Sequence, residues 1–376
     1  MVYPALHAYH TSSMTVEAPR DSRLPAASRS RAATALVALF VATTVVVGSR
    51  SLRREDSVVQ EVSGTTMGTT YSAKFVARSL TADQFWNLQL AIDEWLKGVD
   101  AAMSTYKADS ELSRFNKHDS TEPFPVTQGV LKVFLLAQQV SEASDGAFDI
   151  TVGPLVNSWG FGPEGEPETM PDERRLDELR RHVGFTNIAI DSASSSLVKR
   201  DPLVVADLSA IAKGYAVDGL ADLLVARGFT DFLVEVGGEL RSSGEKPDRM
   251  PWVVGVEAPL PGARILYATM ELRGEAVATS GDYRNFWDAD GDRYSHIIDP
   301  RTGRPLPYVG AAVTVIHERA ALADAWATAM TVLGPVEGAA LAERLDLGVI
   351  FVQQSESGIT ETRTRALRDR RLESVR

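Results

Sequence analysis

The sequence predicts an α+β fold. Helical and strand patterns occur in the same part of the chain, without the regular βαβ alternation that marks a parallel sheet. The longest helical pattern covers 82–103, and a series of strand patterns begins at 232. The chain has 376 residues, 44% of them hydrophobic, which is enough to bury a large core as one large or two small domains.

The helices of the first half are marked by apolar spacing and by their end residues. Apolar residues recur at helical spacing through 82–103, and Thr127 is a good N-cap for a second helix that Asp145-Gly146 ends. A short charged helix is predicted at 172–182. The other predicted elements of this half are a strand over 69–77, an exposed Pro/Gly/Glu loop over 163–171, and strands over 187–190 and 197–206.

Strand patterns dominate the second half. They cover 232–240, 252–257, 266–272, 277–280, 311–316 and 348–352. Two helical patterns, 320–333 and 336–345, precede the last strand. These elements belong to a globular body over 58–354. The polar, arginine-rich segment 355–376 is expected to be a frayed tail.

The N-terminal segment carries signals for export or membrane attachment. Residues 1–31 are rich in Ser, Ala and Arg and lack apolar periodicity, so we expect a disordered arm. Residues 32–48 are an unbroken run of apolar and small residues, at the short end of the length that spans a bilayer. Arginines flank this run on both sides, so the positive-inside signal is weak. We interpret the run as a transmembrane anchor with the body outside the cytoplasm. A signal peptide is the alternative.

Charge and cysteine content exclude several classes of protein. The net charge of −11 argues against a nucleic-acid surface, because phosphate backbones require clustered Lys and Arg. An acidic body is compatible with cation binding. The chain has no cysteine, which excludes disulfides, thiolate nucleophiles, iron–sulfur clusters, cysteine-ligated zinc and a lipoprotein anchor.

The chain is organised around residues 207–214, Asp-Leu-Ser-Ala-Ile-Ala-Lys-Gly. This stretch follows a strand-like run at 203–205 and opens an amphipathic helix. Ser209 is predicted as the N-cap, which would place Ala210 in the first turn. The exposed N–H groups of a helix start, with Lys213 nearby, form an anion site suited to phosphate. A capped structural helix with a surface lysine is the alternative.

Three further segments differ from ordinary core sequence. Met67 lies in Gly-Thr-Thr-Met-Gly, where it is placed either against a flat ring or in a tight turn. Tyr106 follows a helix end, from which it could stack on an aromatic ligand or cover the core. Asp149 lies in an apolar run that leads to the Trp-Gly-Phe-Gly segment 159–162. A carboxylate there needs a partner, and a structural N-cap is an equal alternative.

Two further segments, in the last third of the chain, contain residue types suited to phosphate and metal binding. His296 is embedded in a polar, turn-forming cluster whose Asp-Pro-Arg-Thr-Gly turn is suited to lie beside a phosphate. Asp324 and Thr328 are four residues apart, so their oxygens share one face of a helix. Hard oxygen ligands suit Mg²⁺. A structural role is the alternative for each.

Taken together and in this order, these segments resemble the FAD:protein FMN transferase family, also called the ApbE family. The resemblance runs from about residue 64 to 352. It implies a single domain of mixed, largely antiparallel sheets with packed helices, preceded by the hydrophobic segment. Members use Mg²⁺ and FAD to attach FMN to a Thr or Ser hydroxyl of a target protein, with release of AMP. Targets are typically flavoprotein subunits of membrane redox complexes.

The resemblance also implies roles for individual residues. The residues implied as FAD contacts are Met67, Tyr106, Ala147, Phe148, Asp149, Asp207, Lys213 and Ile298. The implied Mg²⁺ ligands are the backbone carbonyl of Ala210 and the side chains of Asp324 and Thr328. His296 and Asp207 are the implied catalytic residues, and we hypothesise that His296 or a neighbouring Asp takes the proton from the acceptor hydroxyl. Ala327 departs from the family, because some members have a carboxylate there, and the number of metal ligands is therefore open.

The sequence is also compatible with two other functions. A Mg²⁺-dependent FAD pyrophosphatase would need the same site, with water as the acceptor. A non-catalytic periplasmic flavin-binding module would need no metal. Bacterial members of the family are usually exported, which agrees with an inner-membrane anchor and a catalytic domain in the periplasm, or with export by a cleaved signal peptide.

Overall fold

The computed structural model describes residues 57–165, 167, 169–260, 265–283, 286–289, 292–355 and 358–374. The predicted arm and the apolar run at 32–48 lie outside the described residues. Within the described residues, no helix has the length and hydrophobicity needed to cross a bilayer.

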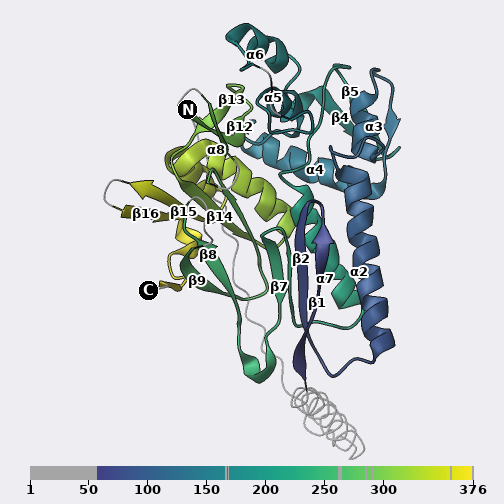
Figure 1. Ribbon diagram of the computed structural model, residues 1–376, viewed down its shortest axis with the longest axis vertical. Coiled ribbons are helices and arrows are strands. Elements are labelled where there is room, and N and C mark those ends of the chain that lie inside the picture. Colours follow the sequence, from purple (N-terminus) through teal and green to yellow (C-terminus); the bar gives the residue numbers. More distant parts are fainter. Residues whose placement is uncertain are drawn as a thin grey trace, which may run out of the picture. The chain divides into compact units, whose positions relative to one another are not determined.

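An eight-stranded antiparallel sheet forms the centre of the body (Figure 1). Its strand order is β1-β2-β6-β7-β10-β14-β15-β16, and each neighbouring pair runs antiparallel. The strands are β1 (Val58–Thr66), β2 (Thr69–Ala77), β6 (Phe232–Val236), β7 (Glu239–Ser243), β10 (Ala276–Gly281), β14 (Ala311–His317), β15 (Gly348–Ser355) and β16 (Gly358–Arg363). The expected α+β fold with largely antiparallel sheets is confirmed.

Three small sheets complete the strands of the described residues, in the orders β11-β12-β13, β17-β9-β8 and β3-β5-β4. Their strands are β3 (Phe124–Pro125), β4 (Ile188–Asp191), β5 (Ser196–Lys199), β8 (Trp252–Glu257), β9 (Leu266–Leu272), β11 (Phe286–Ala289), β12 (Asp292–Asp299), β13 (Arg304–Pro307) and β17 (Leu372–Ser374).

The α-helices are α2 (Ala82–Met103), α3 (Glu111–Lys117), α4 (Gln128–Ala143), α5 (Gly153–Ser158), α6 (Glu173–Arg180), α7 (Ala212–Ala226) and α8 (Ala320–Arg344). The 3₁₀ turns among the described residues are η1 (Ile150–Val152), η2 (Phe185–Asn187), η3 (Pro247–Arg249) and η4 (Arg365–Leu367). The predicted bounds of α2 are confirmed, and Thr81 closes a capping box at its start. Gly334, with φ of 71°, divides α8 where the sequence predicted two helices.

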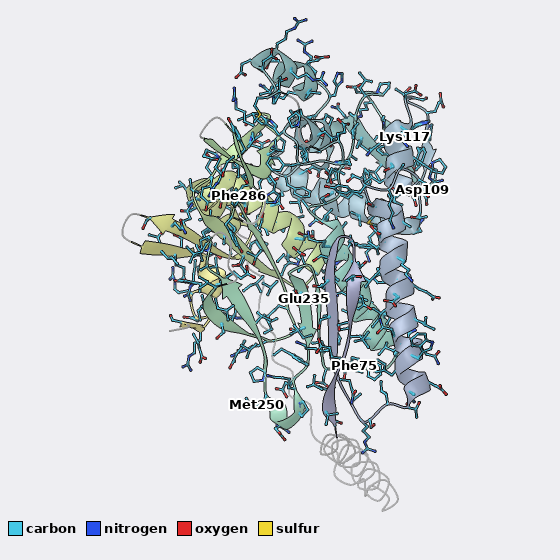
Figure 2. The ribbon with its side chains drawn as sticks, in the orientation of Figure 1. Phe75, Asp109, Lys117, Glu235, Met250 and Phe286 are labelled. Carbon is cyan, nitrogen blue, oxygen red and sulfur yellow. The ribbon has the colours of Figure 1, made fainter. Side chains whose placement is uncertain are left out.

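Alternating burial on the central strands separates two cores. On β15, Val349 and Phe351 contribute to the core beneath the helices, whereas Ile350 and Val352 contribute to a second core that includes Trp252 of β8. Successive strand residues face opposite sides of a sheet, so helices cover one face and the β8–β9–β17 sheet covers part of the other. Phe75 on β2 is fully buried in the first core (Figure 2).

Two sequence predictions near the central stretch are wrong. Residues 203–206 form no strand. The N–H groups of Leu203 and Val204 bond to Asp201. The side chain of Asn116 on α3 accepts from the N–H of Ala206 and donates to its carbonyl, both at 2.8 Å. Helix α7 begins at Ala212 with Ile211 as its N-cap, whereas the sequence placed Ser209 at the cap. The N–H of Ser209 instead bonds to Asp207 Oδ1 at 2.8 Å, which holds 207–211 in a turn.

The expectation of a frayed C-terminal segment is also wrong for most of its described residues. Strand β16 pairs with β15, and β17 pairs with β9. Arg370 fixes the segment between them through Glu275, with Nη1 2.6 Å from Oε1. Arginine and polar content therefore marked an exposed sheet edge here.

Candidate active site

A cavity of about 400 Å³ lies where the starts of α7, β7 and α8 meet β10, β12 and the loop before α5. It contains all but one of the residues proposed from the sequence. Those lining it are Tyr106, Ala147, Phe148, Asp149, Asp207, Ala210, Lys213, His296, Ile298, Asp324 and Thr328. This volume lies in the range of small-molecule sites.

Met67 is not among the cavity-lining residues. It lies in the turn between β1 and β2 with a φ of 48°, and it packs against the main core. Its turn approaches the cavity through Thr69. A Cβ added to Gly237, which lines the cavity, would lie 2.9 Å from Thr69 Cγ2. Met67 therefore borders the site through its neighbours.

The 207–214 turn is fixed from both sides. The N–H of Asp207 donates to the carbonyl of Ile150 at 2.6 Å, which ties the turn to the loop that carries Asp149. Lys213 Nζ donates to the carbonyl of Ser209 at 3.2 Å, so the Lys213 side chain ties the start of α7 to the turn before it. These contacts place Asp207, Ala210 and Lys213 on the cavity wall.

Helices α7 and α8 approach closely at Gly214. A Cβ on Gly214 would lie 2.2 Å from the carbonyl oxygen of Ala320, so any larger residue would force the helices apart. Asp218, one turn along α7, accepts from the N–H groups of Ala320 and Ala321 and so caps α8. The glycine at the end of the 207–214 stretch is thus a packing requirement of the site.

Lys213 lies between two buried carboxylates. Its Nζ is 3.6 Å from Glu239 Oε1 on β7 and 3.9 Å from Asp324 Oδ1 on α8. Burial raises the pKa of Asp324, and the charge of Lys213 and the N–H of Gly214 oppose that rise. Glu239 was not among the residues predicted from the sequence. The sequence feature that could have identified it is a charged residue that directly follows two glycines and begins a strand. In the structure this residue is buried.

The oxygen donors fit a hard divalent cation. The carbonyl of Ala210, the carboxylate of Asp324 and the hydroxyl of Thr328 belong to residues lining the same cavity, and the last two are one turn apart on α8. Within the described ranges, no three Asp, Glu or His side chains cluster as a metal site. One carboxylate with neutral oxygens is nevertheless a donor set that suits Mg²⁺, which keeps waters and binds substrate phosphates.

Asp149 has a structural role that geometry makes plain. Its carboxylate accepts from the N–H of Thr151 at 2.7 Å, from the Thr151 hydroxyl at 2.6 Å and from the N–H of Phe185 at 2.7 Å. Burial raises the pKa of Asp149, and these hydrogen bonds oppose the rise. The carboxylate thereby caps η1 and shapes the wall on which Ala147 and Phe148 are buried.

His296 and Tyr106 stand on the other sides of the cavity. His296 is half-buried on β12, and the ring of Phe161 meets its imidazole edge-on, with centroids 6.3 Å apart. Tyr106 is 70% exposed, and its hydroxyl donates a long hydrogen bond of 3.5 Å to the carbonyl of Phe161. Phe161 was part of a segment noted in the sequence but was given no role there.

The cavity combines groups needed for phosphoryl chemistry. Lys213 and the oxygen donors can bind an anionic phosphate and a cation, and the imidazole of His296 can exchange a proton. Exposed Tyr106 and buried Phe148 offer ring surfaces.

Comparison with known proteins agrees with this geometry. The ApbE family model matches residues 67–351. A FAD:protein FMN transferase of Vibrio cholerae is 43% identical over 300 residues, covering 80% of this chain and 89% of the relative. One of Escherichia coli is 37% identical over 322 residues, covering 84% and 91%. The structure of the flavin transferase ApbE from Vibrio cholerae superposes with a TM-score of 0.76 at 40% identity, covering 84% of this chain and all of that one. The chain therefore belongs to the ApbE family.

Proposed function

We propose that this chain is a FAD:protein FMN transferase, which moves the FMN part of FAD onto a Thr or Ser hydroxyl of a target protein and releases AMP. One observation carries the proposal. The cavity of an ApbE-family chain brings together Lys213, the oxygen donors of Ala210, Asp324 and Thr328, and His296. Charge neutralisation, positioning and a proton acceptor are the requirements of phosphoryl transfer to a hydroxyl.

Each residue has a defined task in this reaction. Lys213 binds the pyrophosphate of FAD with the N–H groups at the start of α7. Tyr106 and Phe148 hold the ring systems of FAD, and Asp207 keeps the turn of Ala210 in place through Ser209. His296 accepts the proton of the attacking hydroxyl. When bound to Ala210, Asp324 and Thr328, Mg²⁺ supplies positive charge to the phosphate oxygens.

The acceptor is a folded or flexible segment of a flavoprotein subunit of a membrane redox complex. Such a protein carries its Thr or Ser to the cavity, whose mouth is bordered by exposed Tyr106. The proposal is supported by the names of the relatives, which describe transfer of FMN from FAD to protein.

The proposal is tested by incubating the purified chain with FAD, Mg²⁺ and a peptide that contains an acceptor Thr. Mass spectrometry of the peptide should show the mass of FMN less one water added, as a phosphoester requires, and EDTA should abolish the gain. Conversion of FAD to free FMN and AMP without peptide labelling would instead identify a pyrophosphatase. Bound but unchanged FAD would identify a flavin-binding module.

The proposed location is the periplasmic side of the bacterial inner membrane, with 32–48 as a single anchor. The support is the apolar run with its flanking arginines. Carbonate extraction of membranes, followed by N-terminal sequencing, tests this. A protein that stays in the membrane with its N-terminus intact supports the anchor, and a released chain beginning after residue 48 supports a cleaved signal peptide.

A further inference from the structure

The segment 159–162, Trp-Gly-Phe-Gly, directly follows α5 and packs against the hairpin that carries His296. The indole Nε1 of Trp159 donates to the carbonyl of Gly303 at 2.8 Å. Its ring stacks on Tyr294 of β12, with centroids 5.5 Å apart. Both contacts lie on the β12–β13 hairpin, so Trp159 holds that hairpin against α5.

Phe161 extends this contact to the cavity itself. Its ring meets the imidazole of His296 edge-on, and its carbonyl accepts from the hydroxyl of Tyr106. Its N–H donates to the carbonyl of Val156 at 3.0 Å, which anchors it to the end of α5. One residue therefore spans the distance between the proposed proton acceptor and the exposed ring at the cavity mouth.

The glycines on either side fix the position of Phe161. Gly160 has a φ of 81°, which L side chains rarely adopt. A Cβ on Gly162 would lie 1.7 Å from Asn157 Oδ1 and 3.2 Å from Asn157 Cα, so a larger residue would have to displace the Asn157 side chain. The turn is thus built to place an aromatic ring beside His296. Phe161 shares the cavity wall with Val152 and Val156, which makes that wall apolar.

An apolar wall beside His296 affects which molecule receives the FMN group. The same site that transfers FMN to a hydroxyl could transfer it to water. In either case the acceptor oxygen forms a bond to the phosphorus of the FMN moiety, the bond from that phosphorus to the oxygen of AMP breaks, and His296 takes the acceptor proton. Water is small and abundant. Transfer to a protein hydroxyl rather than to water therefore requires that water be kept from the position beside His296.

We propose that Phe161 is a specificity-determining residue that shields His296 from water, so that FMN goes to a protein hydroxyl. This inference rests on the proposed transferase function. It assigns to the ring an effect on the ratio of two products, free FMN and flavinylated peptide, and that ratio does not depend on the total activity of a variant.

The test compares Phe161→Ala and Phe161→Leu with the full-length wild-type chain. With FAD, Mg²⁺ and the Thr peptide, Phe161→Ala should raise the ratio of free FMN to flavinylated peptide several-fold. Phe161→Leu keeps apolar bulk and should restore most of the wild-type ratio. Phe229→Ala is the matched control, because Phe229 is also a partly buried aromatic residue but packs against Phe75 in the main core. Its ratio should equal that of the wild type.

The outcomes separate this inference from the function it rests on. A wild-type chain that labels no peptide contradicts both. A wild type that labels the peptide, with both products falling together in Phe161→Ala, contradicts the shielding role alone. Carbethoxylation of His296, followed by mass spectrometry, gives a readout for an inactive variant. Faster carbethoxylation of His296 in Phe161→Ala than in the wild type supports shielding of the imidazole. An equal rate overturns it.

Discussion

Asp324 on α8 accepts a hydrogen bond from the N–H of Gly214 on α7, with Oδ2 3.0 Å from the nitrogen. This bond joins the helix that carries Thr328 to the helix that carries Lys213. It leaves Oδ1 of the carboxylate on the side of Lys213 Nζ, 3.9 Å away. One carboxylate thus aligns two helices and presents an oxygen to the cavity.

Asp324→Ala should abolish Mg²⁺-dependent transfer and weaken Mg²⁺ binding by at least about tenfold, because it removes the only carboxylate of the proposed donor set. Calorimetric titration of Mg²⁺ and the peptide-labelling assay measure the two effects. Asp222→Ala is the control, since the side chain of Asp222 on α7 is 72% exposed. Retained Mg²⁺ affinity in Asp324→Ala would refute the metal assignment.

Gly214→Ala should lower the free energy of unfolding by about 1–3 kcal/mol, because the added methyl meets the carbonyl of Ala320 and overpacks the α7–α8 contact. Urea unfolding measures the change. Gly98→Ala on α2 is the matched control, since its Cβ would meet nothing within 4 Å. There the better helix propensity should raise the free energy of unfolding by about 0.5–1 kcal/mol. A similar effect at both sites would mean that the helices can separate freely.

Sequence patterns predicted a helix or strand correctly where neighbouring residues determine its bounds. Helix α2 carries its own apolar spacing and capping box, and the Gly334-Pro335 break in α8 is written in the sequence. The strand prediction failed at the end of the 203–206 run because Asn116, ninety residues earlier, takes the backbone hydrogen bonds of Ala206. No local pattern contains that partner.

The candidate site shows the same difference between what neighbouring residues and distant contacts determine. The family resemblance supplied the proposed site residues, and all except Met67 line the cavity. It did not reveal Glu239 and Phe161, whose importance lies in what they contact. Glu239 is distinguished by its distance to Lys213, and Phe161 by its contact with His296. Such relations depend on tertiary packing.

Glu239→Gln should raise the KM for FAD about tenfold with a smaller change in kcat. Lys213 has two carboxylates nearby, and a cation bound to Asp324 would leave Glu239 as the carboxylate that holds its ammonium in place, beside the carbonyl of Ser209. Steady-state kinetics measure the split. Glu235→Gln on β6 (Figure 2) is the control, because Glu235 lies outside the cavity lining. An unchanged or lower KM would mean that repulsion between Glu239 and pyrophosphate outweighs its effect on Lys213.

Lys199→Met should remove a rise in stability that the wild type shows between about pH 8 and pH 10.5. Burial lowers the pKa of Lys199 to about 8 in the folded state, from 10.5. In this window the unfolded chain keeps the proton and the folded chain does not, so the free energy of unfolding increases with pH. Below pH 8 the ammonium is charged in both states and contributes no slope.

The Lys199 prediction also concerns the site, because Lys199 Nζ donates to the carbonyl of Asn116 at 2.9 Å. Asn116 holds Ala206, the residue before Asp207. Urea unfolding of Lys199→Met and wild type at several pH values between 7.5 and 10.5 measures the difference in slope. Lys97→Met, at an exposed position on α2, should leave the wild-type slope intact. Parallel curves for Lys199→Met and the wild type would show that Lys199 keeps its proton through this range, and that its burial is compensated by the carbonyls around it.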